Sequence, residues 1–233
     1  MAGKIKENYE RIKREIEEAC RKVGREPEEV KILAATKTRT PEEILEAYEA
    51  GVRLFGENRV QEAKEKIPLL RERMKEARWH MIGHLQTNKV KHAVNLFDCI
   101  ETVDRKSLVD ELIKRLRKEE RRELPVLIEV KLSPEESKHG CPPEEVEELL
   151  EYTLKFPELK VKGLMTVPPY YDEVELVRPF FIRLREIRDR LEEKFGIELP
   201  ELSMGMSHDF KVAVEEGATI VRIGTALFGQ RRY

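Results

Sequence analysis

Residues 30–51 contain one complete strand-and-helix unit, Val30-Lys-Ile-Leu-Ala-Ala-Thr-Lys-Thr-Arg-Thr-Pro-Glu-Glu-Ile-Leu-Glu-Ala-Tyr-Glu-Ala-Gly51. Its apolar run, Val30–Thr36, is too short and has too little polar face for a surface helix, so it predicts a buried strand. The following Thr40-Pro41-Glu42-Glu43 segment supplies an N-cap, a proline at the first helical position and a capping-box acid. The predicted helix ends at Gly51, as helices often do.

The same alternation recurs along the chain. Seven further short apolar runs are each followed by a helix-like segment: Arg53–Phe55, Trp79–Ile82, Asp98–Glu101, Pro125–Lys131, Val161–Met165, Glu201–Ser203 and Thr219–Ile223. Residues 4–23 have apolar side chains every three or four positions, which predicts an amphipathic helix before the first strand. Eight such units in 233 residues predict a single α/β domain over residues 1–233, a (β/α)8 TIM barrel with an extra N-terminal helix. A doubly wound sheet is the alternative, but its usual Gly-x-Gly-x-x-Gly turn is absent.

Composition excludes several classes of function. The 44 Lys and Arg against 46 Asp and Glu give a net charge of −2, which disfavours general nucleic-acid binding. The longest uncharged run, Trp79–Asn88, is far shorter than the roughly 20 apolar residues of a membrane span. The N-terminus is charged where a signal peptide would be apolar, so we expect a cytoplasmic protein. Three widely spaced cysteines without a Cys-x-x-Cys pair are expected to be free thiols.

A lysine directly follows the first predicted strand. Lys37 comes after Thr36, and TIM barrels build their active sites from strand C-termini and the loops after them. Partial burial at the barrel mouth favours the neutral amine that attacks a carbonyl carbon. Schiff-base chemistry is therefore one hypothesis for Lys37. A loop lysine that pairs with a surface acid is the other.

The last two predicted strands end in loops rich in glycine and hydroxyl residues. Ser203-Met-Gly-Met-Ser207 and Arg222-Ile-Gly-Thr-Ala226 can bring backbone N–H and side-chain O–H groups to one place. Barrels commonly hold a phosphate after strands 7 and 8, so the pair of loops predicts an anionic ligand. Arg222 also lies near the end of an apolar strand, where its guanidinium needs a partner. That partner is either a buried carboxylate or a ligand atom, such as a heterocycle nitrogen or an acid group.

Two histidines and two residues after the second predicted strand are further candidates. His80 and His84 have the spacing of a helical metal pair, but their run predicts a strand and turn and lacks the glutamate of a zinc protease motif. We therefore expect no metal site. His84 is expected at the mouth and His80 as a buried, hydrogen-bonded histidine. Glu57 and Asn58 either face the mouth or cap the next helix.

Taken together, these residues resemble the pyridoxal phosphate homeostasis protein family. The similarity runs through Lys31-Ile-Leu-Ala-Ala-Thr-Lys-Thr38, Phe55-Gly-Glu-Asn-Arg-Val-Gln-Glu62, Trp79-His-Met-Ile-Gly-His-Leu-Gln-Thr-Asn-Lys89, residues 133–140, Gly163-Leu-Met-Thr166, Leu202-Ser-Met-Gly-Met-Ser207 and Val221-Arg-Ile-Gly-Thr-Ala-Leu-Phe-Gly229. It covers essentially the whole chain. The resemblance implies a fold-type III pyridoxal phosphate barrel, similar to the N-terminal domain of alanine racemase.

The resemblance also implies which residues surround the ring of the cofactor, pyridoxal 5'-phosphate. Lys37 would form the internal aldimine, and Arg222 would face the pyridine nitrogen. Asn58 and His84 would approach the ring or its substituents. Lys138 resembles a basic position near the cofactor hydroxyl in the racemase barrels.

The same resemblance implies a phosphate site in the last two loops. Ser207, Gly224 and Thr225 would hold the phosphate. Met204 and Gly205 would line the same loop. All of these are cofactor-binding assignments, and none is catalytic.

We favour a binding function over turnover. An arginine at the ring nitrogen keeps that nitrogen unprotonated, which makes the ring a poorer electron sink. The sequence also stops at Tyr233, shortly after the last barrel motif, so we expect no second domain like the one that supplies a catalytic tyrosine in alanine racemases. The expected protein is a monomeric carrier that holds pyridoxal phosphate, passes it to dependent apo-enzymes and acts in vitamin B6 homeostasis. The alternatives are an amino-acid racemase or decarboxylase, and an aldolase-like lysine enzyme acting on a sugar phosphate without a cofactor.

Overall fold

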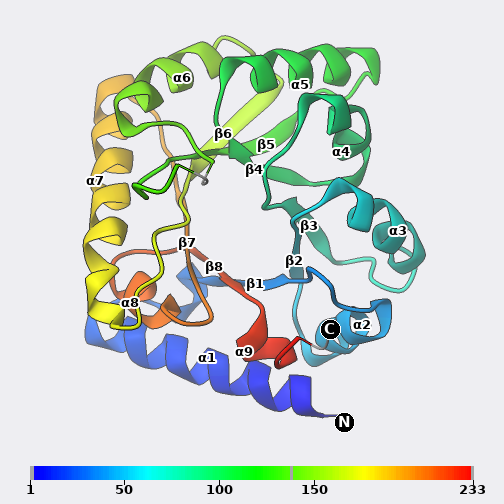
Figure 1. Cartoon of the computed structure of the whole chain (residues 1–233), viewed down its shortest axis with the longest axis vertical. Coiled ribbons are helices and arrows are strands. Elements are labelled where there is room, and N and C mark those ends of the chain that lie inside the picture. The colour runs from blue at the N-terminus through cyan, green and yellow to red at the C-terminus, as the bar shows by residue number, and fades with distance from the viewer. Residues whose placement is uncertain (1–2, 137–138, 232–233) are drawn as a thin grey trace.

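Eight parallel strands close into one barrel in the computed structural model, which describes residues 3–136 and 139–231 (Figure 1). The strands are β1 (Lys31–Ala35), β2 (Leu54–Glu57), β3 (Arg78–Met81), β4 (Cys99–Val103), β5 (Leu124–Glu129), β6 (Leu159–Met165), β7 (Glu201–Met206) and β8 (Ile220–Ile223). Each strand pairs with the next, and β8 pairs with β1 through the register Leu33 to Arg222. The predicted TIM barrel is therefore confirmed.

Helices surround the barrel on its outer side (Figure 1). They are α1 (Lys4–Lys22), α2 (Pro41–Ala50), α3 (Val60–Leu70), α4 (Val90–Leu96), α5 (Lys106–Lys118), α6 (Val146–Thr153), α7 (Arg178–Phe195), α8 (Phe210–Glu215) and α9 (Thr225–Phe228). Short 3-10 turns lie at Pro27–Glu29, Thr87–Lys89, Pro143–Glu145 and Val174–Leu176. The predicted capping box of α2 is present, because the Glu43 N–H donates to Thr40 Oγ1 and the Thr40 N–H donates to Glu43 Oε1, both at 3.1 Å.

The extra helix α1 takes a place in this outer ring. It packs against α2, α8 and α9, and Asn8 Nδ2 donates to the carbonyl oxygen of Leu227 at 2.8 Å. Its apolar stripe, which includes Ile12 and Ile16, is buried in the main core. The short helices α8 and α9 leave part of the barrel wall uncovered, and α1 covers it.

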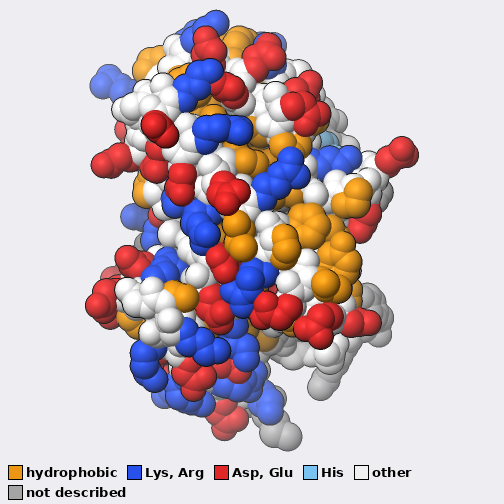
Figure 2. Space-filling view, turned by 90° about the vertical axis from the view of Figure 1, so that its left-hand side faces the viewer, with side chains coloured by type: hydrophobic (Ala, Val, Ile, Leu, Met, Phe, Trp, Pro, Cys, Tyr) orange, Lys and Arg blue, Asp and Glu red, His pale blue; other side chains and the backbone are white. Residues whose placement is uncertain are grey.

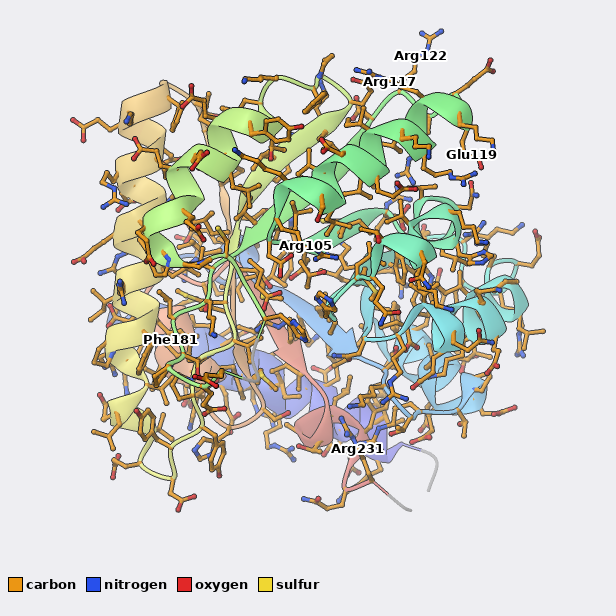
Figure 3. The ribbon with its side chains drawn as sticks, turned by 45° about the horizontal axis from the view of Figure 1, so that its top comes forward. Arg105, Arg117, Glu119, Arg122, Phe181 and Arg231 are labelled. Atoms are coloured by element: carbon orange, nitrogen blue, oxygen red, sulfur yellow. The ribbon has the colours of Figure 1, made fainter. Side chains whose placement is uncertain are left out.

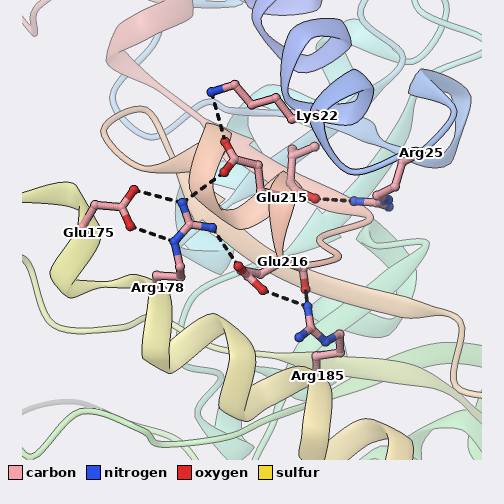
Figure 4. Close-up of polar contacts among 8 residues, drawn as sticks. Lys22, Arg25, Glu175, Arg178, Arg185, Glu215 and Glu216 are labelled. Atoms are coloured by element: carbon pink, nitrogen blue, oxygen red, sulfur yellow. Dashed lines mark hydrogen bonds and ion pairs between the residues drawn. The ribbon is translucent and has the colours of Figure 1, made fainter.

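A charge network joins α1, α7 and α8 (Figure 4). Arg178 donates to Glu175, Glu215 and Glu216 at 2.7 to 3.0 Å, and Arg185 donates to Glu216 at 3.0 Å. From the segment after α1, Arg25 Nη1 donates to the carbonyl oxygen of Val214 at 2.7 Å. Over the face that carries α7, positive and negative side chains are interspersed, as the near-zero net charge suggests (Figure 2).

Strand side chains alternate between two environments. Outward residues such as Ala34 and Phe55 belong to the main core between strands and helices, which Phe181 of α7 also enters (Figure 3). Inward residues form two small apolar clusters, one around Leu33 and Leu54 and the other around Leu127. Toward the C-terminal ends of the strands, the inward positions become polar: Glu101, Glu129, Ser203 and Arg222 are all buried. This polar layer forms the floor of the barrel mouth.

Candidate functional site

Lys37 follows β1 at the barrel mouth. Leu33 and Ala35 face the barrel interior, so the two-residue alternation gives Lys37 the next inward position. The Thr36 N–H still donates to the carbonyl oxygen of Gly56, at 3.0 Å, which extends the strand pairing to the residue before the lysine. Lys37 is half-buried, whereas Thr36 is fully buried. Lys37 is therefore the first residue after the hydrogen-bonded part of the strand.

The turn that carries Lys37 is anchored from outside the barrel. Lys66 Nζ, on α3, donates to the carbonyl oxygen of Thr36 at 2.8 Å and to Glu57 Oε1 at 3.0 Å. The hydroxyl of Thr36 donates to the same Glu57 oxygen at 2.7 Å. Glu62 Oε2 accepts the backbone N–H of Thr38 at 3.1 Å. Together these contacts hold both sides of the lysine in place.

Glu57 does not face the mouth or cap a helix, and both sequence-based options for it are wrong. Strand β2 extends to residue 57, and the alternation turns Glu57 to the outer side, as it does Phe55. The carboxyl is fully buried, which raises its pKa, although Lys66 and the Thr36 hydroxyl act to lower it. Glu57 therefore supports the lysine turn from behind.

The loops after β7 and β8 meet at the hydroxyl of Ser207. Ser207 Oγ accepts the backbone N–H groups of Gly224 at 3.2 Å and Ala226 at 3.1 Å. The structure thus brings Ser207, Gly224 and Thr225 together, as the sequence indicated. Gly205 lets the end of β7 pack closely against α8. Its φ is 100°, and an added Cβ would lie 2.6 Å from the Cβ of Ala213.

Met204 lies apart from this cluster. Its side chain is fully buried in the main core between the sheet and the helices. Methionine often fills such a core. A ligand at the mouth would meet the backbone of this stretch and not the thioether.

Arg222 lies buried in the polar layer below the mouth. Its Nη1 donates to Ser203 Oγ at 2.7 Å, and its Nη2 donates to the carbonyl oxygen of Thr166 at 2.8 Å. Among the described residues, no carboxylate is paired directly with the guanidinium, and its hydrogen bonds involve Nη1 and Nη2 and not Nε. Burial lowers the pKa of Arg222, and the charges of Glu101, Glu129 and Asp209 act to raise it. The direct carboxylate pair considered from the sequence is therefore not formed.

Asn58 and His84 lie on the loops after β2 and β3. The two loops touch, because a Cβ on Gly83 would lie 2.1 Å from the carbonyl oxygen of Asn58. His84 is exposed and stacks on His139, with ring centroids 3.8 Å apart. Although His84 is exposed, the protein atoms around its ring desolvate it in part and lower its pKa, and the nearby His139 and Arg105 lower it further. Lys138 lies outside the described residues.

Arg105 connects these loops to α5. It donates to the carbonyl oxygen of Leu85 and to Asp104, both at 2.7 Å. Figure 3 shows Arg105 at the start of α5, with Arg117 and Glu119 at its opposite end.

Within residues 3–136 and 139–231, no group of three or more His, Cys, Asp or Glu side chains could hold a metal ion.

The sequence did not point to Glu101 or Glu129 as functional candidates, and it placed Ser203 only in the loop predicted to bind an anion, without its contact to Glu101. Glu101 accepts Ser203 Oγ at 2.5 Å, and its other oxygen lies 2.6 Å from Nδ1 of the partly buried His80. Burial and the nearby Asp104 raise the pKa of Glu129 to about 7. A signal existed in the sequence, because both glutamates lie two residues after an inward apolar residue, Cys99 or Leu127. An acid at an inward strand position indicates a polar layer.

Comparison with known proteins places the chain in a class. Residues 3–232 match the model of the alanine racemase N-terminal domain. An alanine racemase of Clostridium difficile superposes with a TM-score of 0.74 at 14% identity, over 99% of this chain and 57% of the racemase. At that identity the likeness concerns the fold alone.

Nearer relatives share the full length of the chain. A pyridoxal phosphate homeostasis protein of Aquifex aeolicus is 51% identical over 227 residues, which cover 97% of this chain and 98% of the relative. That of Vibrio alginolyticus is 42% identical, with 98% of both chains covered. PipY of Synechococcus elongatus, solved with PLP bound, has a TM-score of 0.82 at 35% identity, over 92% of this chain and all of PipY. The chain belongs to the pyridoxal phosphate homeostasis protein family.

None of the helices in the described part of the chain is long and apolar enough to cross a membrane.

Proposed function

We propose that this protein binds pyridoxal phosphate at the barrel mouth and acts in pyridoxal phosphate homeostasis. The observation that carries the proposal is the arrangement of three unlike groups around one mouth. A lysine follows β1, two loops converge on Ser207, and a buried guanidinium lies below. An amine, a phosphate-binding cluster and a nitrogen-facing donor match the aldehyde, the phosphate and the pyridine nitrogen of this one cofactor.

Lys37 is the residue proposed to bind the aldehyde. Its amine would condense with the aldehyde carbon, form a carbon–nitrogen double bond and release one water molecule. When bound, the cofactor supplies a visible chromophore and a conjugated ring that can accept electrons. The anchored Thr36 turn limits the positions the amine can reach, which favours one orientation of the bound aldehyde.

Ser207, Gly224 and Thr225 are proposed to hold the phosphate. The N–H groups that now converge on the Ser207 hydroxyl are donors of the kind that bind phosphate oxygens. Gly205 would contribute by allowing the turn, and Met204 by packing beneath it. Asn58 and His84 would flank the ring from the loops after β2 and β3.

Arg222 is proposed to donate its free Nε–H to the ring nitrogen. A guanidinium only donates hydrogen bonds and does not give up its proton at neutral pH, so it leaves the ring nitrogen unprotonated. That weakens the ring as an electron sink and favours storage over turnover. We propose a monomeric carrier in the cytoplasm that gives its cofactor to dependent apo-enzymes. The name of the relatives, pyridoxal phosphate homeostasis protein, supports the role in homeostasis.

Borohydride trapping tests the assignment of Lys37. The purified protein with added pyridoxal phosphate should be yellow and should lose that colour on reduction, with the added mass on the peptide containing Lys37. Lys37→Ala should lose the visible band. Lys31→Ala, at the other end of β1 and paired with Glu201, is the control and should keep it. An adduct on a different lysine would contradict the assignment.

Two further assays separate a carrier from an enzyme. The loaded protein should leave L- and D-alanine unchanged, and loss of optical activity in step with protein concentration would favour a racemase. It should also activate an apo-enzyme faster than the same amount of cofactor escapes into buffer. Equal rates would mean free release and would remove the case for directed transfer. A protein that binds no pyridoxal phosphate would favour the lysine enzyme acting on a sugar phosphate.

A further inference from the structure

A chain of hydrogen bonds crosses the barrel interior from the mouth toward its opposite end. Arg222 Nη1 donates to Ser203 Oγ at 2.7 Å, and the Ser203 hydroxyl donates to Glu101 Oε1 at 2.5 Å. The other carboxylate oxygen lies 2.6 Å from His80 Nδ1. The four residues come from β8, β7, β4 and β3. We call them the interior chain.

The direction of these bonds is determined by the chemistry of the groups. A guanidinium only donates, so the oxygen of Ser203 must accept from Arg222 and its single hydrogen must point to Glu101. Burial acts to raise the pKa of Glu101, but the hydrogen bonds and charges of His80 and Arg222 hold it below its ordinary value. An ionised Glu101 accepts from both sides, so His80 Nδ1 is a donor.

The interior chain also determines where Arg222 points. The guanidinium is planar, and both of its terminal nitrogens are engaged, Nη1 by Ser203 and Nη2 by the carbonyl of Thr166. With two corners of a rigid plane held, the direction of Nε–H is fixed as well. Loss of the Ser203 contact would leave one corner held, and the plane could then rotate.

The far end of the interior chain is reachable from the opposite end of the barrel. His80 lines two cavities of about 600 Å³ and 500 Å³ at the N-terminal ends of the strands, both shared with Lys31 and Arg78. Its side chain is 13% exposed, whereas Glu101 is fully buried. A small molecule in these cavities could therefore reach the place of the imidazole without passing through the mouth.

We propose that Ser203, Glu101 and His80 are positioning residues that hold the Arg222 guanidinium as an oriented donor toward the mouth. This inference rests on the proposed function only for the identity of the ligand that Arg222 faces. The interior chain links the buried guanidinium to the Glu101 carboxylate through the Ser203 hydroxyl, so no carboxylate of the interior chain is hydrogen-bonded directly to the guanidinium. A buried charge held in this way keeps its orientation before the ligand arrives.

The first test uses the protein without cofactor. Arginine labelled with ¹⁵N gives a side-chain NMR signal for each guanidinium, and Arg222→Lys identifies the signal of Arg222. A held guanidinium exchanges its Nε–H slowly with water. Ser203→Ala should accelerate that exchange, and Thr153→Val, which also removes one buried hydroxyl bond but lies on α6, should not. Equal exchange in the wild type and Ser203→Ala would overturn the proposal, whether or not the protein binds pyridoxal phosphate.

The second test uses the visible band of added pyridoxal phosphate. His80→Ala removes the donor at the far end and should weaken cofactor binding about tenfold, in line with the loss of a hydrogen bond to a charged group. Imidazole added to this variant should restore the affinity, because the cavities give it access to Glu101. Sodium chloride at the same ionic strength should not. His80→Gln keeps an N–H donor and should bind nearly as the wild type does.

The two tests distinguish the possible failures. Absence of a visible band in the wild type would contradict the proposed function. The NMR measurement would then decide by itself whether the interior chain holds Arg222. A visible band with unchanged affinity in His80→Ala, or without rescue by imidazole, would show that His80 does not position Arg222. If His80→Ala does not fold, the exchange of the Arg222 Nε–H in Ser203→Ala still decides whether the interior chain holds the guanidinium.

Discussion

Replacing Glu129 by glutamine should stabilise the protein at high pH and not at low pH. The carboxyl is buried at the C-terminal end of β5, and Asp104, Glu101 and Arg222 are the charged groups that act on it. Burial, with Asp104, raises its pKa from 4.5 to about 7, and Arg222 acts to lower it. No hydrogen bond to the Glu129 carboxyl is found among the described residues, so glutamine loses little at this position.

The size of the effect follows from linkage. The folded chain binds the Glu129 proton more tightly than the unfolded chain does. The contribution of Glu129 to the free energy of unfolding is therefore fully present below about pH 4.5 and is lost as the pH rises to about 7. At about 1.4 kcal/mol per pKa unit, the loss amounts to about 3 kcal/mol above that pH. Glutamine does not titrate, so Glu129→Gln avoids this loss.

Guanidinium unfolding of wild type and variant, both freed of cofactor, measures the difference. The gain in free energy of unfolding should be small near pH 4 and grow to about 3 kcal/mol near pH 8. Groups that do not interact with Glu129 titrate alike in both proteins and cancel in the comparison. A difference that stays constant with pH would refute the reasoning, because it would mean that Glu129 has an ordinary pKa in the folded chain.

Two further predictions concern the supports of the site, and a third concerns the buried thiols. Lys66→Met leaves Glu57 buried without its cation and should cost about 3 kcal/mol of stability, measured by guanidinium unfolding, and should loosen the Lys37 turn. Gly205→Ala places a Cβ against Ala213 at a positive φ and should cost about 2 kcal/mol or more in the same assay. The three buried cysteines, whose pKa values burial raises, should react slowly with a thiol reagent when folded and quickly when unfolded.

The two substitutions each have a matched control, and the labelling prediction has a contradicting outcome. Lys64→Met, on the same helix and without an ion pair among the described residues, should change stability little. Gly196→Ala also has a positive φ, 61°, but open space around it, so it should cost only about 1 kcal/mol. Fast labelling of the folded protein would contradict the burial of the thiols, and equal effects at Gly205 and Gly196 would contradict the close contact with Ala213.

The strand-and-helix order and the meeting of the loops after β7 and β8 were predictable, because they depend on local sequence patterns and on the order of strands in the barrel. The capping box of α2 and the meeting of Ser207 with Gly224 follow from local patterns and from barrel topology. The sequence analysis placed Glu57 after β2, but β2 continues two residues beyond its predicted end, and the alternation then puts Glu57 on the outer face with Phe55. The pairing of Ser203 with Glu101 joins residues 102 positions apart, for which a single sequence contains no local signal.

The supports of the mouth come from three different layers of the fold. The Lys37 turn is held from outside the barrel wall through Lys66, the proposed phosphate loop is held by backbone N–H groups at the rim, and Arg222 is held from within the barrel. None of these sets of hydrogen bonds shares a residue with another. A perturbation of one set should therefore change one of the proposed ligand contacts and leave the others in place. Such an arrangement suits a protein that must hold its ligand firmly and still release it, because one contact can be given up while the rest keep the ligand oriented.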